Sequence, residues 1–220
     1  MVFELPLFPL NTVLFPGMPM TLHIFEQRYR QMIQECVQTE QPFGVALIKD
    51  GVEAMGPLAE PHRVGCTAEI AQVQSLKGGR MNIVAVGRER FQIISLHYEQ
   101  PYLKGLVEAY PLDEDEDKDT AIVSRRLRPW LEEYLGLLSA AGDVDFDISS
   151  LPNDPEALAY LAATVLQIPN RQKQALLSSA GAFTMLADMQ QIYRRELPIL
   201  RLLLREDDAM PVGPSPFSVN

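Results

Sequence analysis

The chain has 220 residues, and its 19 lysines and arginines against 29 aspartates and glutamates give a formal net charge of −10. A folded chain of this length buries roughly 70% of the surface that its unfolded form exposes, so core size excludes neither one large domain nor two small ones. The negative charge disfavours non-specific binding to nucleic-acid phosphates and to anionic membranes.

The N-terminal segment is rich in apolar side chains, yet it lacks the pattern of a secretory signal. Glu4 stands where a signal has basic residues. Four prolines interrupt the apolar runs: Pro6, Pro9, Pro16 and Pro19. No other window has the roughly 18 apolar residues of a membrane span. These patterns predict a cytoplasmic protein that does not contact a membrane.

The first half of the chain has the patterns of extended segments around one helix. Residues 3–10 and 12–15 are predicted to be extended, because residues before proline avoid the α region and proline lacks a ladder donor. Apolar residues at three-to-four spacing predict an amphipathic helix over residues 25–39. Cys36 lies in this helix and Cys66 in a later strand pattern, and both are predicted to be buried free thiols.

Strand signals follow one another after the helix. The predicted strands cover residues 43–49, 65–76, 81–87, 90–98 and 102–110. The two glycines of the KGGR segment, residues 77–80, predict a hairpin turn because they tolerate the positive φ of a tight turn. Together the segments predict a small curved antiparallel sheet or barrel, with one early helix, over residues 1–112.

The acidic run DEDEDKD, residues 113–119, separates this half from the next. Like charges this close together repel one another and resist burial. The run is therefore predicted to be a solvated hinge or the entrance to a helix. An acidic recognition strip is the functional alternative.

Residues 120–207 have helical patterns and predict a helical bundle. Pro129 interrupts the first apolar stripe and predicts either a kink or a division into two helices. Asp154, followed by proline, predicts the start of the next helix. A short helix and a last helix over residues 183–205 follow, and residues 208–220 have the composition of a flexible tail.

Six motifs of the first half, taken in order, resemble the N-terminal domain of Lon-type ATP-dependent proteases. They are LPLFPLNTVLFPG, IFEQRY, FGVALI, VGCTAEI, GRERF and PYLKGLVE. Of these, IFEQRY is more similar to stand-alone members of the family than to full-length proteases. The segments LPNDPEALAYLAATVLQIP and KQALLSS are similar to the helical continuation of the domain. The resemblance implies an α+β fold in which a PUA-like β-rich lobe precedes an α-helical bundle.

Full Lon proteases add an ATPase module and a protease module with a Ser-Lys pair, and no segment here resembles either. The chain has no G-x-x-x-x-G-K-[ST] loop for phosphates. No catalytic residue is therefore carried over, and no cofactor is predicted. His23 and Glu26 have a spacing that suits metal ligands, but no third ligand accompanies them, so no metal site is predicted.

Five residues are the candidates for binding a polypeptide. Met18 and Met20 lie in the PGMPM loop and Met55 in a second loop, and flexible thioethers suit varied apolar partners. Methionine also fills cores, which is the structural alternative. Arg88 and Arg90 lie in the GRERF motif, where a salt-bridged strand end is the other interpretation.

The chain is predicted to be a non-catalytic protein-recognition module that binds polypeptide substrates or a partner protein, in proteolysis or protein quality control. The resemblance implies this role, since the corresponding domain of the full proteases is associated with substrate selection and assembly. Two alternatives stay open. PUA-like lobes elsewhere bind RNA, although the negative charge and the lack of a basic, aromatic-interleaved stretch disfavour nucleic acid. The other alternative is an uncharacterised hydrolase.

Overall fold

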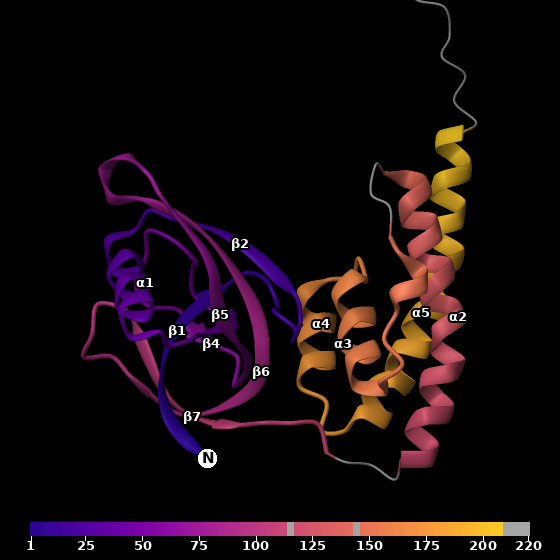
Figure 1. Cartoon of the computed structure of the whole chain (residues 1–220), viewed down its shortest axis with the longest axis horizontal. Coiled ribbons are helices and arrows are strands. Elements are labelled where there is room, and N and C mark those ends of the chain that lie inside the picture. The colour runs from indigo at the N-terminus through magenta and orange to yellow at the C-terminus, as the bar shows by residue number, and fades with distance from the viewer. Residues whose placement is uncertain (114–116, 143–145, 209–220) are drawn as a thin grey trace, which may run out of the picture.

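The computed structural model describes residues 1–113, 117–142 and 146–208. Figure 1 shows two packed lobes: a β lobe formed by the sheet and helix α1, and a helical lobe formed by α2 to α5. The predicted α+β fold is confirmed. The predicted flexible tail lies outside the described residues beyond Asp208, as do residues 114–116 of the predicted acidic hinge. Within the described ranges, no helix combines the length and the hydropathy that a membrane crossing requires.

The β lobe is a barrel. Its strands are β1 (Val2–Leu10), β2 (Pro19–Ile24), β3 (Phe43–Asp50), β4 (Glu60–Pro61), β5 (Val64–Ser75), β6 (Met81–His97) and β7 (Leu103–Ala109). Antiparallel ladders join β1, β7, β6, β5 and β3 in that order, and a parallel pairing of β3 with β1 closes the ring. β2 pairs with β6 and β4 pairs with β3 outside this ring.

Strand β6 is continuous over 17 residues, where the sequence analysis predicted two strands at 81–87 and 90–98. Gly87 is the last residue of the first predicted strand, and another part of the backbone approaches it closely. Its amide donates to the carbonyl of Met18 (2.9 Å), and its carbonyl accepts from the amide of Gly17 (2.8 Å). A Cβ at Gly87 would lie 2.2 Å from the carbonyl oxygen of Phe15. This glycine marks a backbone crossing, not the end of a strand.

We expect Gly87→Ala to lower the free energy of unfolding by about 1–3 kcal/mol, because the new Cβ would displace backbone. Gly136→Ala is the matched control: Gly136 is exposed inside α2 (Asp117–Ala141), and a Cβ there meets no atom within 4 Å. The control is expected to gain up to about 1 kcal/mol through helix propensity. Urea unfolding gives the free energy of unfolding of both variants. Equal values for Gly87→Ala and Gly136→Ala would contradict the close backbone approach at Gly87.

Residues 12–15, which were predicted to be extended, form no strand, and the sequence analysis did not predict β2. Val13, Leu14 and Phe15 are buried, but they form no strand. Their apolar character reflects burial in the cores of the molecule. β2 begins at Pro19, inside the predicted PGMPM loop, and it pairs with β6 as far as Ile24. A proline is tolerated there because it is the first residue of an edge strand.

Helix α1 (Gln27–Thr39) confirms the predicted amphipathic helix, although it begins two residues later than residue 25. Its buried side chains are Tyr29, Met32, Ile33 and Cys36. They pack into a core cluster with residues of the strands, and the rings of Phe8 and Tyr29 stack with their centroids 4.0 Å apart. The helix ends at Glu40, whose φ of 53° turns the chain toward β3.

The helical lobe consists of α2 with α3 (Pro155–Val165), α4 (Asn170–Leu177) and α5 (Ala182–Asp208). Figure 1 shows α2 and α5 side by side, and the two helices pack against each other. α2 continues through Pro129 as one helix, so the predicted division at this residue does not occur. The predicted start of α3 is confirmed, since the Asp154 carboxylate accepts a hydrogen bond from the amide of Ala157 (2.7 Å).

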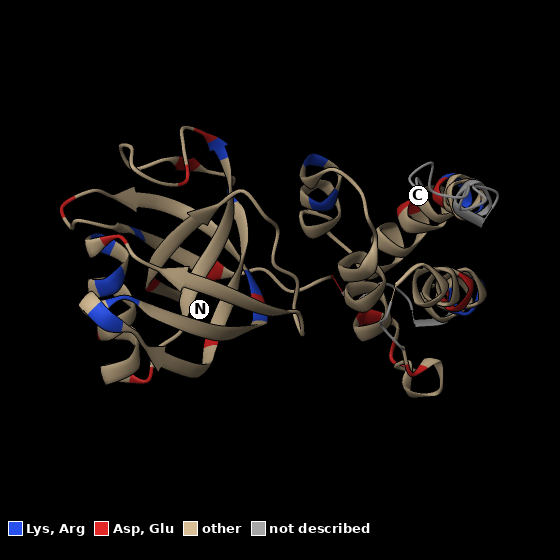
Figure 2. Ribbon diagram, turned by 90° about the horizontal axis from the view of Figure 1, so that it is seen from above, with Lys and Arg blue, Asp and Glu red and all other residues tan. Residues whose placement is uncertain are grey.

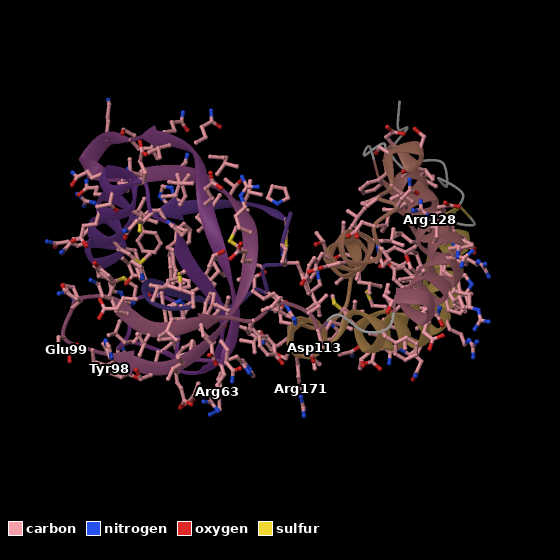
Figure 3. All side chains as sticks on the ribbon, turned by 60° about the horizontal axis from the view of Figure 1, so that its bottom comes forward. Arg63, Tyr98, Glu99, Asp113, Arg128 and Arg171 are labelled. Carbon is pink, nitrogen blue, oxygen red and sulfur yellow. The ribbon has the colours of Figure 1, made fainter. Side chains whose placement is uncertain are left out.

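The two lobes share a hydrophobic core. Residues that precede position 113 join helical residues such as Leu158 and Leu176 in one buried cluster: Val13, Phe15, Leu47, Val64 and Leu112. The chain crosses between the lobes at Asp113, which Figure 3 labels at their boundary. There the amide of Asp113 donates to the carbonyl of Ala180 (2.8 Å). The lobes are therefore joined by side chains and by main chain.

Candidate functional site

The three candidate methionines lie in different environments. Met20 points inward from β2 and is only 8% exposed, inside the core of the β lobe. Met18 is half-buried and packs against the cores of both lobes. Met55 is 87% exposed in a loop, where its φ is 59°. Of the three, only Met55 is thus fully available to a partner. β2 begins at Pro19, so the predicted PGMPM loop is confined to residues 16–18.

The two candidate arginines also differ. Arg88 is exposed, and its Nε donates to the Glu69 carboxylate (2.6 Å). Arg90 is 3% exposed, and its Nη1 donates to the carbonyls of Leu177 and Ser179, each at 2.7 Å. These carbonyls lie at the C-terminal end of α4, where a positive charge is favourable. Arg90 therefore links β6 to the helical lobe.

A cavity of about 290 Å³ brings Arg88 and Arg90 together at the boundary of the lobes. Pro16, Glu156 and Tyr160 line it as well. The Nε and Nη2 atoms of Arg90 have no hydrogen-bond partner among the described residues, but they are buried away from the surface. The guanidinium also lies over the ring of Tyr110, 4.8 Å from its centroid. The contacts of Arg90 therefore have a structural role: they hold the two lobes together.

A larger groove separates α1 from β5, with a volume of about 420 Å³. On one side it is lined by the end of α1 and the residues that follow it: Cys36, Val37, Glu40 and Gln41. On the other side it is lined by five consecutive residues of β5: Glu69, Ile70, Ala71, Gln72 and Val73. We call this space the α1–β5 groove.

Strand β5 presents its edge to this groove. Successive side chains of a strand point to opposite faces, so a lining of five consecutive residues means that the groove runs along the strand's edge. On this side, β5 pairs with β3 only through residues 66–68 of β5. Beyond Ala68, β5 pairs with β6 alone as far as Ser75, within the described part of the chain. The edge that faces away from β6 is therefore open.

The side chains of the groove are apolar with acidic flanks. Val37 and Val73 are 44% and 41% exposed, and Ile70 is half-buried and packs against the core of the β lobe. Glu40 lies on the helical side and Glu69 on the strand side. The groove therefore offers apolar contacts, a backbone edge and negative charge.

Cys36 lines the groove but does not provide a reactive thiol. It is 2% exposed, and burial raises the pKa of its thiol to about 11. Burial likewise raises the pKa of Cys66 to about 12. Both cysteines are free and buried, as the sequence analysis predicted. Since the thiolate is the nucleophile, neither side chain is poised for chemistry near neutral pH.

We expect both thiols of the native protein to react with an aromatic disulfide at pH 8 at least about tenfold more slowly than a free thiol, because burial keeps them protonated. The measurement is the absorbance of the released thiolate. Addition of 6 M guanidinium chloride should restore the ordinary rate. A fast native reaction of either cysteine would contradict its burial.

His23 and Glu26 do not form a metal site with a third ligand. The Nδ1 of His23 lies 2.7 Å from the Asn82 side-chain oxygen, while Glu26 pairs with Arg28 (2.9 Å). Across the described residues, no group of three or more His, Cys, Asp or Glu side chains is arranged to hold a metal ion.

Residues 4–192 match the family of the ATP-dependent protease La (LON) substrate-binding domain. The Lon protease of Anaeromyxobacter dehalogenans is 28% identical over 211 residues, and Lon protease 2 of Myxococcus xanthus is 26% identical over 208 residues. Each alignment covers 94% of this chain and 25% of the relative. The chain thus spans about a quarter of the length of the curated relatives that it matches.

Two solved structures share the fold. The N-terminal domain of the Mycobacterium avium complex Lon protease superposes with a TM-score of 0.68 at 22% identity, over 87% of this chain and 98% of that one. A Lon N-terminal domain protein from Xanthomonas campestris gives a TM-score of 0.62 at 24% identity, over 86% and 98%. Both the barrel and the helices therefore belong to one conserved architecture.

Proposed function

Because the chain belongs to the family of Lon substrate-binding domains, we propose that it recognises polypeptide through the α1–β5 groove. The recognition is non-catalytic, and it serves proteolysis or protein quality control. The observation that carries this proposal is the combination of exposed valines and an open strand edge along one groove of about 420 Å³.

The groove suits segments that a folded protein does not expose. Val37 and Val73 offer apolar contacts from opposite walls, and such contacts favour side chains that are buried in a native partner. Unfolded chains expose both apolar side chains and unpaired backbone. A groove that contacts apolar side chains and also pairs with free backbone groups therefore binds unfolded segments in preference to folded surfaces.

The negative charge of −10 makes nucleic acid a poor partner for the whole molecule. Figure 2 shows lysines and arginines on both lobes, with acidic residues among them. Several of the exposed basic side chains are engaged in ion pairs, such as Arg88 with Glu69 and Arg201 with Glu133. Polypeptide is therefore the partner class that the site favours.

The test is direct binding of one model protein in two forms. The purified chain is titrated with a reduced, carboxymethylated globular protein and, separately, with the same protein in its native state. We expect saturable binding of the unfolded form at micromolar concentrations and at least about tenfold weaker binding of the native form. Absence of saturable binding to the unfolded form would overturn the proposal.

A further inference from the structure

We propose that the α1–β5 groove binds its polypeptide by strand addition: an extended segment pairs with the open edge of β5 and continues the sheet. This inference rests on the proposed function and specifies its mode. Strand addition draws its affinity from main-chain hydrogen bonds and therefore accepts varied sequences. Such tolerance suits a module that must recognise many unfolded segments.

The direction of the backbone groups follows from Gly87. Its amide and carbonyl both bond toward the segment before β2, so in the alternating antiparallel ladder those of Val86 point toward β5. Val86 is opposite Glu69, which places the backbone groups of Ile70 on the far edge. The register shifts between Ile70 and Gln72, and Val73 then pairs with Ile83. The same alternation along β6 places the backbone amide and carbonyl of Val73 on the far edge as well.

Within the part of the chain that the structure describes, no strand other than β6 pairs with β5 beyond Ala68. β3 leaves β5 at Ala68, and among the described residues no further strand replaces it along Glu69 to Ser75. α1 stands on the other side of the groove and, as a helix, bonds its own backbone. An extended chain placed about 4.8 Å from β5 would supply the missing partners.

The side chains define the chemistry of the occupant. Alternate residues of an added strand would face Ile70, Val37 and Val73, and apolar β-branched side chains fit such a surface. Glu40 has no basic partner in the groove, whereas Glu69 is paired with Arg88. The wall near Glu40 therefore favours a basic side chain. The occupant is an extended segment that alternates apolar residues with basic or neutral polar ones.

The experiment uses a nine-residue peptide of alternating valine and lysine, and its binding to the full 220-residue chain is measured by fluorescence anisotropy. Val73→Pro removes one outward amide and leaves the ladder to β6 intact, since a proline is tolerated on an edge. Val73→Thr is the matched control, because it keeps the amide and the β-branched shape. We expect Val73→Pro to weaken binding at least about tenfold and Val73→Thr by less than about threefold.

A second measurement does not depend on a variant. Amide exchange followed by NMR should slow for Ile70 and Val73 when the peptide is bound, because their amides would donate to it. Binding that leaves both amides unprotected, or equal affinities for Val73→Pro and the wild-type chain, would overturn strand addition while the proposed function stands. Failure of both the peptide and the unfolded protein to bind would overturn both proposals.

A second copy of the chain is the competing occupant of an open edge. Sedimentation of the wild-type chain and of Val73→Pro decides between the two. The proposal expects monomers or unchanged oligomers in both cases. A wild-type dimer that Val73→Pro dissociates, without any effect on peptide affinity, would assign the edge to self-association and contradict strand addition.

Discussion

Phe15→Ala is expected to lower the free energy of unfolding by about 3–5 kcal/mol, the range for truncating a fully buried phenylalanine. Phe15 has no exposed surface and lies in the cluster that both lobes share. Its removal would leave a cavity in this shared cluster. Guanidinium unfolding followed by circular dichroism gives the value.

Phe25→Ala provides the matched control for this truncation. Phe25 is 46% exposed and makes its aromatic contact with the ring of His23, whose centroid lies 6.0 Å away. We expect this change to cost less than about 1 kcal/mol, as for most exposed positions. A similar loss in the two variants would mean that the core shared by the lobes contributes little to stability.

Arg90→Ala is expected to lower the free energy of unfolding by about 2–4 kcal/mol. Two hydrogen bonds from a charged donor are lost, each worth about 1.5–3 kcal/mol, and the carbonyls of Leu177 and Ser179 lose their partner. Part of this loss is offset, because the Nε and Nη2 atoms of Arg90 no longer have to be buried without a partner. Urea denaturation measures the change.

Arg88→Ala is the natural comparison, since the two residues lie in the same motif. Arg88 forms an exposed ion pair with Glu69, and exposed pairs contribute little, so a change within about 0.5 kcal/mol is expected. If both arginines had the same effect, the role of Arg90 as the link between the lobes would be wrong. If only Arg90→Ala lowers the stability, one of the two arginines of the GRERF motif has a structural role.

The contacts within the β lobe and between the lobes determine how rigid the α1–β5 groove is. The shared core, the Arg90 link and the main-chain bond at Asp113 hold the barrel against the helical lobe. The α1–β5 groove is formed by the β lobe alone. A bound segment would therefore meet a surface whose geometry is fixed by the barrel, which limits the ordering cost of binding to the polypeptide itself.

Periodicity predicted most of the elements correctly because it reports which face is buried. The helix at α1 and the cap of α3 at Asp154 have strong local signals, and both are confirmed. The errors arose where tertiary contacts decide. Val13, Leu14 and Phe15 are apolar because they are buried in the cores, and a glycine stands at position 87 because the backbone of Phe15 lies against it.

The candidate site was harder to predict for a physical reason. An open strand edge depends on where a neighbouring strand ends, and the residues of β5 do not contain that information. Val37 follows the apolar spacing of α1 and therefore resembled a core residue. One signal was available: the predicted strand at 65–76 is longer than the one at 43–49, so a single neighbour of that length would leave part of it without a partner on one side.

The central claim is that unfolded polypeptide binds in the α1–β5 groove, and site-specific photo-crosslinking tests it most directly. A benzophenone side chain is introduced at Val37, in the groove, and separately at Ile94, an equally exposed apolar residue on β6 (44% and 45%). Illumination with the carboxymethylated protein should give crosslinks at position 37 and few at position 94. Equal crosslinking at both positions, or crosslinking at position 94 alone, would contradict the claim.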